Sequence, residues 1–305
     1  MFGGFAVLPR FQSISVRPKR LTAGAVLVLA AFALAGCGGG LPGKDVFSGG
    51  LFNKKETGPE MDSRPPEVIY GEAETLMNEQ KYKDAAQKYE DVDINHPYSQ
   101  EARHSIVMAA YSYYKVGKYT EAISAGQRYL TLHPGTEEAP LAQNIIAMSY
   151  YDQVLDPKRD QTNARKALGA YETLLQRYSD SRYAAEAQNR VLILRNLLAA
   201  NEMTVGRYYL RNNNYLAAIN RFRDVVTKYQ QTEQVEEALM RLTEAYLALG
   251  IVNEAETAAA VLGHNFPDSK WYKHAYALLQ KKGRQPQEHE GSWITQTFEG
   301  SGNPA

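Results

Sequence analysis

The spacing of small, apolar and polar residues repeats along the chain from Pro65 onward. Five times, an alanine stands three residues after a position that is most often tyrosine, and the helical pattern breaks fifteen residues after that position. The repeated alanines are Ala85, Ala122, Ala167, Ala218 and Ala255. Three of the five breaks contain proline, which cannot continue a helix. Each repeat therefore predicts a helix that ends at a defined point.

A second apolar pattern of helical period precedes each of these helices. Small residues recur in it at one register, where a neighbouring helix must approach closely: Ala73, Ala110, Ala147 and Gly206. Neither helix of such a pair can bury its apolar stripe alone, but antiparallel pairs stacked on one another can. The pattern resembles the tetratricopeptide repeat. We therefore predict an all-α fold, a tetratricopeptide-like α-solenoid of about five helix pairs with a C-terminal capping helix.

The repeat pattern also predicts the domain boundaries. The repeat domain covers 65–282, with units at about 65–99, 100–135, 138–181, 182–232 and 233–268 and a cap at 269–282. Extra residues at 152–162 predict a long loop inside the third unit. Residues 181–211 contain no proline, so they predict a single long helix. The polar end of the chain, 283–305, is expected to be disordered; Trp293 and Phe298 within it could anchor a partner or be a chance cluster.

An apolar run near the N-terminus predicts export. The run from Leu21 to Ala33 follows a basic leader and is 13 residues long. It is shorter than the roughly 20 residues that span a bilayer and suits a secretory signal peptide, here residues 1–36. The stretch Leu34-Ala35-Gly36-Cys37 resembles a bacterial lipoprotein signal. The resemblance implies that Cys37 carries a diacylglycerol and an N-acyl chain, whereas the alternative is an ordinary signal peptide with a chance cysteine.

The residues that follow the cysteine predict a flexible tether at 37–64. Seven glycines and two prolines lie within 38–64, a composition that buries too little apolar surface to fold. No aspartate follows Cys37 directly, and in lipoproteins this absence implies the outer membrane. We expect the protein to be attached to the membrane by its lipid anchor, with the repeat domain on the periplasmic face.

Charge and motifs exclude several classes of function. Without residues 1–36 the chain has 30 basic and 34 acidic residues, a net charge of −4, so no nucleic acid partner is expected. The sequence holds no Gly-rich phosphate loop, and its single cysteine is the predicted lipid attachment site. His96 and His133 share the repeat position of Tyr178, which favours packing over metal binding. The sequence therefore predicts a protein that is not an enzyme and has no cofactor apart from the lipid on Cys37.

The chain has 21 tyrosines, and the repeat pattern places some of them along a groove. An aromatic ring with a hydroxyl tip suits the binding of an extended peptide. The candidate groove residues are Tyr70, Tyr111, Tyr113 and Tyr114. For each of them, the alternative is a place in the core between helices.

Three further stretches of the sequence are distinctive: His96-Pro97-Tyr98-Ser99-Gln100 after the first repeat, Val205-Gly206-Arg207-Tyr208-Tyr209, and Asn220-Arg221. They resemble the BamD family, the outer-membrane lipoproteins of the β-barrel assembly machinery. The lipoprotein signal, the tether and the repeats together extend the resemblance over nearly the whole mature chain. His96 stands where the family usually has an aromatic residue, and we add it to the candidate groove.

The resemblance implies a scaffold that binds other proteins. Its C-terminal repeats would dock onto the POTRA region of the barrel component BamA, with Arg221 paired to a BamA carboxylate and Tyr209, Tyr208 and Asn220 nearby. Its N-terminal repeats would hold unfolded outer-membrane β-barrel proteins, and other assembly-machinery lipoproteins would bind elsewhere. For Arg221, the alternative is an ion pair with Asp224 or a neighbouring helix.

Two other functions stay open from the sequence. The first is another periplasmic tetratricopeptide-repeat adaptor, such as the Tol-associated coordinator of wall synthesis or a secretin pilotin. The second is a lipid-anchored envelope enzyme, for which the sequence offers no nucleophile or metal cluster.

Overall fold

The computed structural model describes residues 62–300, which all belong to one unit of the chain, Pro59–Ala305. The predicted signal peptide, Cys37 and nearly all of the predicted tether lie outside the described residues. The described residues form twelve α-helices: α1 (Pro66–Asn78), α2 (Tyr82–Asn95), α3 (Gln100–Lys115), α4 (Tyr119–Leu132), α5 (Ala139–Tyr151), α6 (Thr162–Arg177), α7 (Ala184–Arg211), α8 (Tyr215–Lys228), α9 (Gln234–Leu249), α10 (Val252–Asn265), α11 (Lys270–Gln280) and α12 (Trp293–Gly300).

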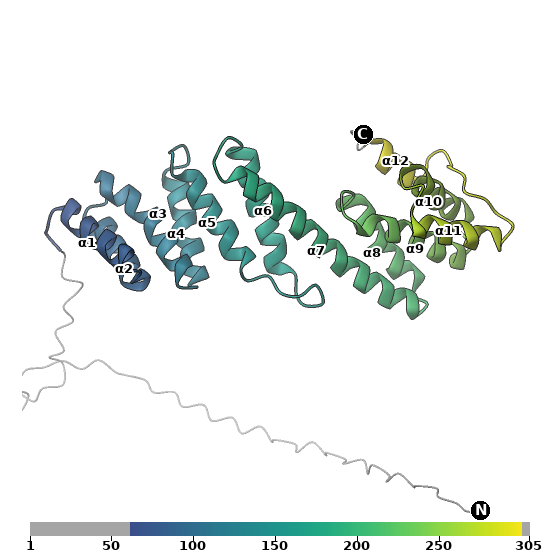
Figure 1. The fold of residues 1–305 in the computed structure, drawn as a ribbon, viewed down its shortest axis with the longest axis horizontal. Helices are drawn as coiled ribbons and strands as arrows, with labels where there is room; N and C mark the ends of the chain where they lie inside the picture. The colour runs from purple at the N-terminus through teal and green to yellow at the C-terminus, as the bar shows by residue number, and fades with distance from the viewer. Residues whose placement is uncertain (1–61, 301–305) are drawn as a thin grey trace, which may run out of the picture. The chain divides into compact units, whose positions relative to one another are not determined.

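The helices pack in chain order, as Figure 1 shows. Each helix from α1 to α10 contacts the next, and the first helices of successive pairs also touch in three cases, α1 with α3, α3 with α5 and α7 with α9. The helix α11 packs on α9 and α10 at the end of the series. The predicted all-α, tetratricopeptide-like arrangement of five helix pairs with a capping helix is confirmed.

The second helix of each pair ends at the same repeat position. The residue after each of these helices has φ between −131° and −137° and ψ between 39° and 63°, so the chain leaves the helix in the same way each time. These residues are His96, His133, Tyr178, Tyr229 and Phe266. Ser99 then starts α3, because its hydroxyl accepts a hydrogen bond from the Ala102 amide at 2.9 Å.

The turns inside the pairs also share one geometry. Two residues before the second helix, the backbone is left-handed in four of the five pairs, at Gln80, Gly117, Asn213 and Gly250. In the third pair a longer segment, 152–161, connects α5 to α6, where the sequence predicts a loop. This loop contacts α7, because the Asn201 side chain donates a hydrogen bond to the Pro157 carbonyl at 2.5 Å.

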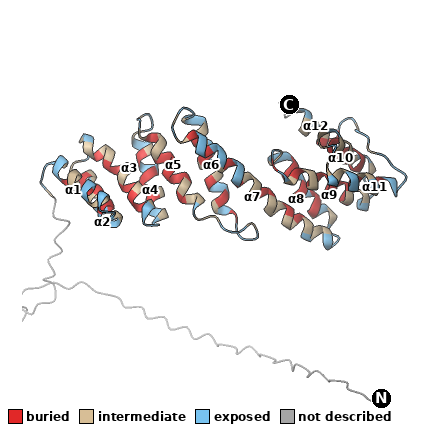
Figure 2. Cartoon of the chain, viewed as in Figure 1, coloured by how far each residue is buried: buried red, intermediate tan, exposed pale blue. Residues whose placement is uncertain are grey.

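The core runs between the helices, and Figure 2 shows buried residues on each helix from α1 to α11. Ala73, Ala110 and Ala147 are fully buried at the register predicted for close helix approach. At Gly206, a Cβ atom would lie 2.5 Å from the Phe222 ring, so α7 and α8 touch there through a glycine. The long helix predicted within 181–211 is α7, with 28 residues.

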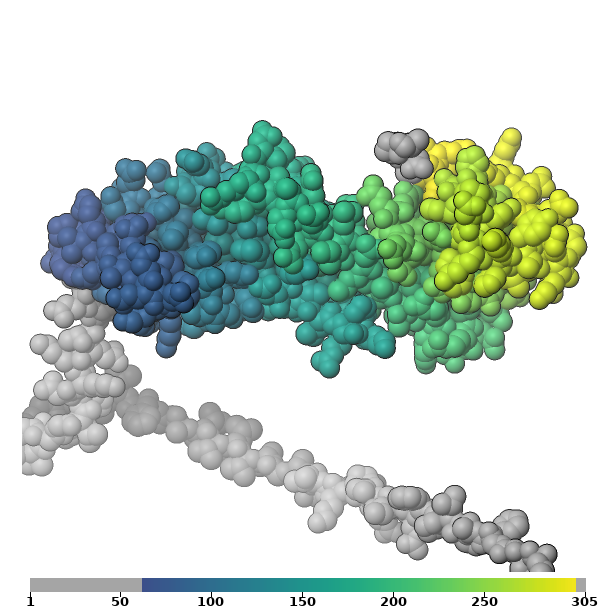
Figure 3. Space-filling model, viewed as in Figure 1, coloured from purple at the N-terminus to yellow at the C-terminus, as the bar shows by residue number. Residues whose placement is uncertain are grey.

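The prediction of a disordered tail is wrong for residues 283–300. Residues 293–300 form α12, which packs on α10 and α8, and Figure 3 shows the yellow C-terminal residues packed onto the green residues before them. Ile294 is fully buried, and the Trp293 indole N–H donates to the Tyr246 hydroxyl at 3.0 Å. The few apolar residues of this segment cannot form a core by themselves. They fold because a neighbouring repeat supplies the rest of the core.

In the described part of the chain, no helix is both long and apolar enough to cross a membrane.

Candidate functional site

The candidate groove residue Tyr70, on α1, is half-buried against two rings. Its ring centroid lies 5.5 Å from that of Tyr89 on α2 and 5.8 Å from that of His104 on α3. Burial, with the neighbouring Tyr89, raises the pKa of the Tyr70 phenol above its ordinary value. Tyr70 is therefore partly a core residue, and it reaches the surface next to His104.

The three tyrosines of α3 differ in burial and in the residues that they contact. Tyr113 is only 7 % exposed and lies in the hydrophobic core, so the prediction that it lines a groove is wrong. The ammonium nitrogen of Lys115 lies 5.8 Å from the centroid of the Tyr111 ring and 5.6 Å from that of the Tyr82 ring on α2. Helical geometry separates Tyr113 from the other two, because residues three apart, such as Tyr111 and Tyr114, share a helix face and Tyr113 lies on another.

Tyr114 contacts different neighbours from Tyr111. Its hydroxyl donates a hydrogen bond to the Asp152 carboxylate at 2.8 Å, and its ring lies 6.1 Å from that of Tyr119. Burial and the bond to Asp152 raise the pKa of Tyr114 to about 12. Tyr114 therefore joins α3 to the start of α4 and to the loop after α5.

His96 makes a local contact at the end of α2. Its Nε2 atom lies 2.7 Å from the Arg64 carbonyl oxygen, 32 residues earlier in the chain. Two residues on, Tyr98 is fully exposed and contributes nothing to the core. The structure therefore does not gather His96, Tyr70 and the α3 tyrosines into one groove.

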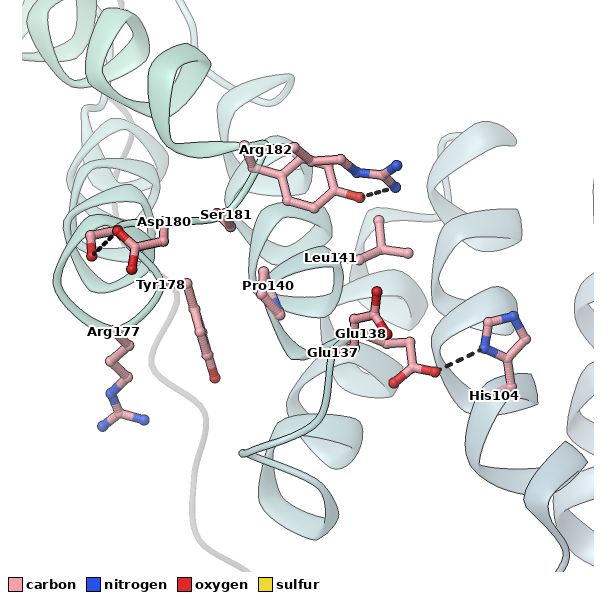
Figure 4. A pocket seen from close by; sticks show the side chains of 12 residues that line it. His104, Glu137, Glu138, Pro140, Leu141, Arg177, Tyr178, Asp180, Ser181 and Arg182 are labelled. Carbon is pink, nitrogen blue, oxygen red and sulfur yellow. Dashed lines mark hydrogen bonds and ion pairs between the residues drawn. The ribbon is translucent and has the colours of Figure 1, made fainter.

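A surface pocket of about 800 Å³ lies beside Tyr70 and His104, where the sequence predicts no site. Figure 4 shows its side chains coming from three segments: the start of α3, the α4–α5 turn and the α6–α7 turn. Tyr178 forms one wall, and its hydroxyl donates to the Pro134 carbonyl at 3.1 Å. One feature of the sequence points to this pocket. The repeat position directly after each second helix, where Tyr178 lies, is always aromatic or histidine.

The pocket contains groups of both charge signs. The Glu138 carboxylate lies 3.4 Å from the His104 ring and accepts a hydrogen bond from Tyr129 at 3.1 Å. Burial acts to raise the pKa of Glu138, but its own backbone amide, Tyr129 and His104 outweigh that effect and lower the pKa. Arg182 lies over the Tyr183 ring at 4.9 Å, on the far side of the pocket. The pocket can therefore hold a polypeptide with both polar and aromatic groups.

Arg221, on α8, is held by a neighbouring helix. Its guanidinium lies 3.1 Å from the Glu202 carboxylate on α7, and Asp224 pairs instead with Lys228 at 2.7 Å. The Arg221 side chain is 42 % exposed, whereas that of Glu202 is 12 % exposed. The carboxylate thus fixes the position of the arginine and leaves part of its guanidinium open to solvent.

The other predicted partner-binding residues differ in exposure. Tyr208 is 57 % exposed, and its ring meets that of Tyr209 edge-on at 5.7 Å, while Tyr209 packs against the C-terminal core. Asn220 is exposed and lies one turn after Leu216, which is 66 % exposed, on the same face of α8. The sequence did not single out Leu216, because an isolated leucine at the start of a helix carries no distinguishing pattern.

No cluster of three or more His, Cys, Asp or Glu side chains able to hold a metal ion occurs within residues 62–300.

Comparison with known protein sequences places the chain in one family. Residues 62–262 match the family model YfiO, described as an outer membrane lipoprotein. The outer membrane protein assembly factor BamD of Caulobacter vibrioides is 37 % identical over 85 % of this chain and 81 % of its own length. The BamD proteins of Rickettsia prowazekii and Neisseria meningitidis serogroup A are each 34 % identical, over 76 % and 69 % of this chain and 92 % and 82 % of their own lengths.

Proposed function

Because the chain belongs to the YfiO family of outer membrane lipoproteins and is a homologue of the non-enzymatic assembly factor BamD, we propose that it is a two-ended scaffold for the assembly of outer-membrane β-barrels. In this proposal the C-terminal repeats bind the POTRA region of BamA. The N-terminal repeats hold unfolded outer-membrane proteins, and other lipoproteins of the machinery bind the remaining surface. The match over residues 62–262 favours this role over that of another periplasmic repeat adaptor.

The Arg221–Glu202 pair is the observation that carries the BamA half of the proposal. A cation that is held in place before binding loses less conformational entropy when it meets a partner carboxylate. Glu202 provides that restraint, and the exposed part of the Arg221 guanidinium keeps donors free for a second acceptor. Exposed Tyr208, Asn220 and Leu216 supply polar and apolar contact area on α7 and α8.

The substitution Arg221→Glu tests the BamA half. It places a carboxylate opposite Glu202 and opposite the proposed BamA acid, so we expect BamA affinity to fall by about thirtyfold, or ~2 kcal/mol. The measurement is co-purification and titration of the BamA POTRA region against the variant, with circular dichroism to check helix content. Lys228→Glu, another exposed cation on α8, is the matched control and should bind BamA normally.

The same variant separates the two halves of the proposal. In a repeat protein each unit contacts mainly its neighbours, so Arg221→Glu should leave the binding of unfolded outer-membrane protein to the N-terminal repeats unchanged. The pocket lined by His104, Tyr178 and Arg182 supports a binding role for that half. If BamA binds Arg221→Glu as tightly as the original protein, Arg221 has only its intramolecular role.

We also propose that Cys37 carries the lipid that holds the protein at the periplasmic face of the outer membrane. The outer membrane lipoprotein family to which the chain belongs supports this, and so does the signal sequence before the cysteine. Mass spectrometry of the mature N-terminus should show Cys37 as the first residue with a diacylglycerol and an acyl chain. An unmodified Cys37, or cleavage at another residue, would remove the anchor.

A further inference from the structure

The C-terminal helix shows what the groove between two successive second helices can hold. α12 lies along α8 and α10, and its Trp293 side chain bonds to Tyr246 near the end of α9. Arg223 of α8 lies over the Trp293 ring at 4.8 Å. The Ser292 hydroxyl, just before the helix, donates to the Glu254 carboxylate of α10 at 2.8 Å. One short amphipathic helix thus fills a groove made by three helices of two repeats.

The equivalent groove two repeats earlier in the chain holds no helix of residues 62–300. A surface groove of about 570 Å³ lies among α4, α5 and α6, the repeat equivalents of α8, α9 and α10. Tyr150 and Gln127 line it, and they occupy the repeat positions of Tyr246 and Arg223. Its floor is buried: Ile146 is 5 % exposed, and the Gln143 amide donates to the Ala170 carbonyl at 2.8 Å.

A glycine forms part of the wall of this open groove. Gly169 is exposed in the middle of α6, and a Cβ atom built there would meet nothing within 4 Å. Glycine inside a helix is less stable than alanine, and no close neighbour among residues 62–300 requires it. Its repeat equivalent, Thr257, accepts a hydrogen bond from the His289 amide of the segment before α12. Gly169 therefore lies where a docked chain would approach α6.

The rim of the open groove carries a positive charge where the groove that holds α12 carries a negative one. Lys166 stands directly before the repeat alanine of α6, where α10 has Glu254. Its ammonium group lies 5.5 Å from the centroid of the Tyr150 ring. Arg177, at the other end of the groove, is exposed, and no acidic side chain among residues 62–300 forms an ion pair with Lys166 or Arg177.

From this repeat equivalence and charge, we propose that the groove among α4, α5 and α6 is a docking site for an acidic amphipathic helix of a partner protein. The helix lies as α12 does in its own groove, with an aromatic anchor against Tyr150 and a carboxylate in its first turn at Lys166. A carboxylate at the N-terminus of the partner helix also interacts favourably with the dipole of that helix. The α12 of a second copy is the poorer occupant, because Ser292 offers no charge to Lys166. This site is separate from Arg221 and goes beyond the scaffold function proposed above.

A designed peptide tests the site with the full-length lipoprotein in detergent. The probe is a fluorescent synthetic peptide of residues 288–300 carrying Ser292→Asp, which pairs with Lys166 but repels Glu254 in the C-terminal groove. We expect saturable binding by fluorescence anisotropy, at least threefold tighter than that of the unchanged peptide. Hydrogen exchange should slow in residues 166–173. Lys166→Glu in the protein should weaken binding at least tenfold.

Two substitutions at one position complete the test. Gly169→Trp fills the groove and should abolish peptide binding, whereas Gly169→Ala fits the open space and should retain it. Circular dichroism verifies that both variants remain helical. The proposal is overturned if the peptide shows no saturation below about 1 mM, or if Gly169→Trp and Lys166→Glu bind it unchanged. Equal affinity for a peptide carrying Ser292→Lys would also overturn it.

Discussion

Single residues decide how closely the helices of this protein approach one another. Gly206 faces the ring of Phe222, which is fully buried, and a Cβ atom at 206 would lie 2.5 Å from that ring. The ring is enclosed by the core and cannot move aside without displacing its neighbours. Gly169, also inside a helix, faces open space. The same residue type thus serves two different purposes.

These two glycines give opposite predictions for one substitution. Gly206→Ala should destabilise the protein by about 1–3 kcal/mol, because overpacking against Phe222 exceeds the gain in helix propensity. Gly169→Ala should stabilise it by about 0.5–1 kcal/mol, because only helix propensity changes. Urea unfolding of both variants, followed by circular dichroism, measures the difference. A stabilised Gly206→Ala would show that α7 and α8 are not in close contact.

Charged residues illustrate the limit of sequence reasoning at this scale. The sequence singles out Arg221 and leaves open whether it pairs with Asp224, a neighbouring helix or a partner protein. In the structure its intramolecular partner is Glu202, nineteen residues earlier on α7. Choosing among several carboxylates requires the relative rotation of two helices. That rotation depends on how the buried side chains between them pack.

At the scale of elements, helix limits follow closely from local signals. The repeated alanines and the helix breaks predict the second helices and where they end, and α2, α4, α6, α8 and α10 each end within two residues of the predicted break. Each break is a local event, because proline or a change of backbone conformation ends a helix without help from distant residues. The long helix α7 and the 152–161 loop follow from the same signals.

The C-terminal element was the clearest failure of local reasoning. Trp293, Ile294 and Phe298 are too few to form a core by themselves, so the sequence around them reads as disordered. α12 exists because Tyr246, Arg223 and the α8 and α10 surfaces complete its environment. Local reasoning also does not predict the places of the candidate groove tyrosines. Tyr113 lies in the core, and Tyr111 and Tyr114 make separate contacts.

At the scale of the whole molecule, each repeat contacts mainly its neighbours, so a deletion at one end should destabilise only the repeats next to it. Deleting residues 283–305 removes the buried Ile294 and the Trp293–Tyr246 bond, and it leaves Glu256 without the His289 contact at 2.8 Å. Burying one such apolar side chain contributes about 1.5–3 kcal/mol, so we expect a loss of stability on that order. Hydrogen exchange should accelerate in α8–α11 and stay unchanged in α1–α6.

A chain that ends at residue 300 is the control for this deletion, since it keeps α12. Its exchange rates and thermal midpoint should match those of the complete protein. Accelerated exchange in α1–α6 after deletion of 283–305 would mean that stability is shared over the whole array instead of between neighbours.

The sequence by itself determined the helical repeats, their limits and the family, because period, small residues and helix breaks act over a few neighbouring positions. Tertiary structure alone decided which tyrosines are core, which carboxylate holds Arg221, that the end of the chain folds as α12 and that an equivalent groove stays open. These features depend on surfaces contributed by residues far apart in sequence, whose contacts exist only after the helix pairs have stacked.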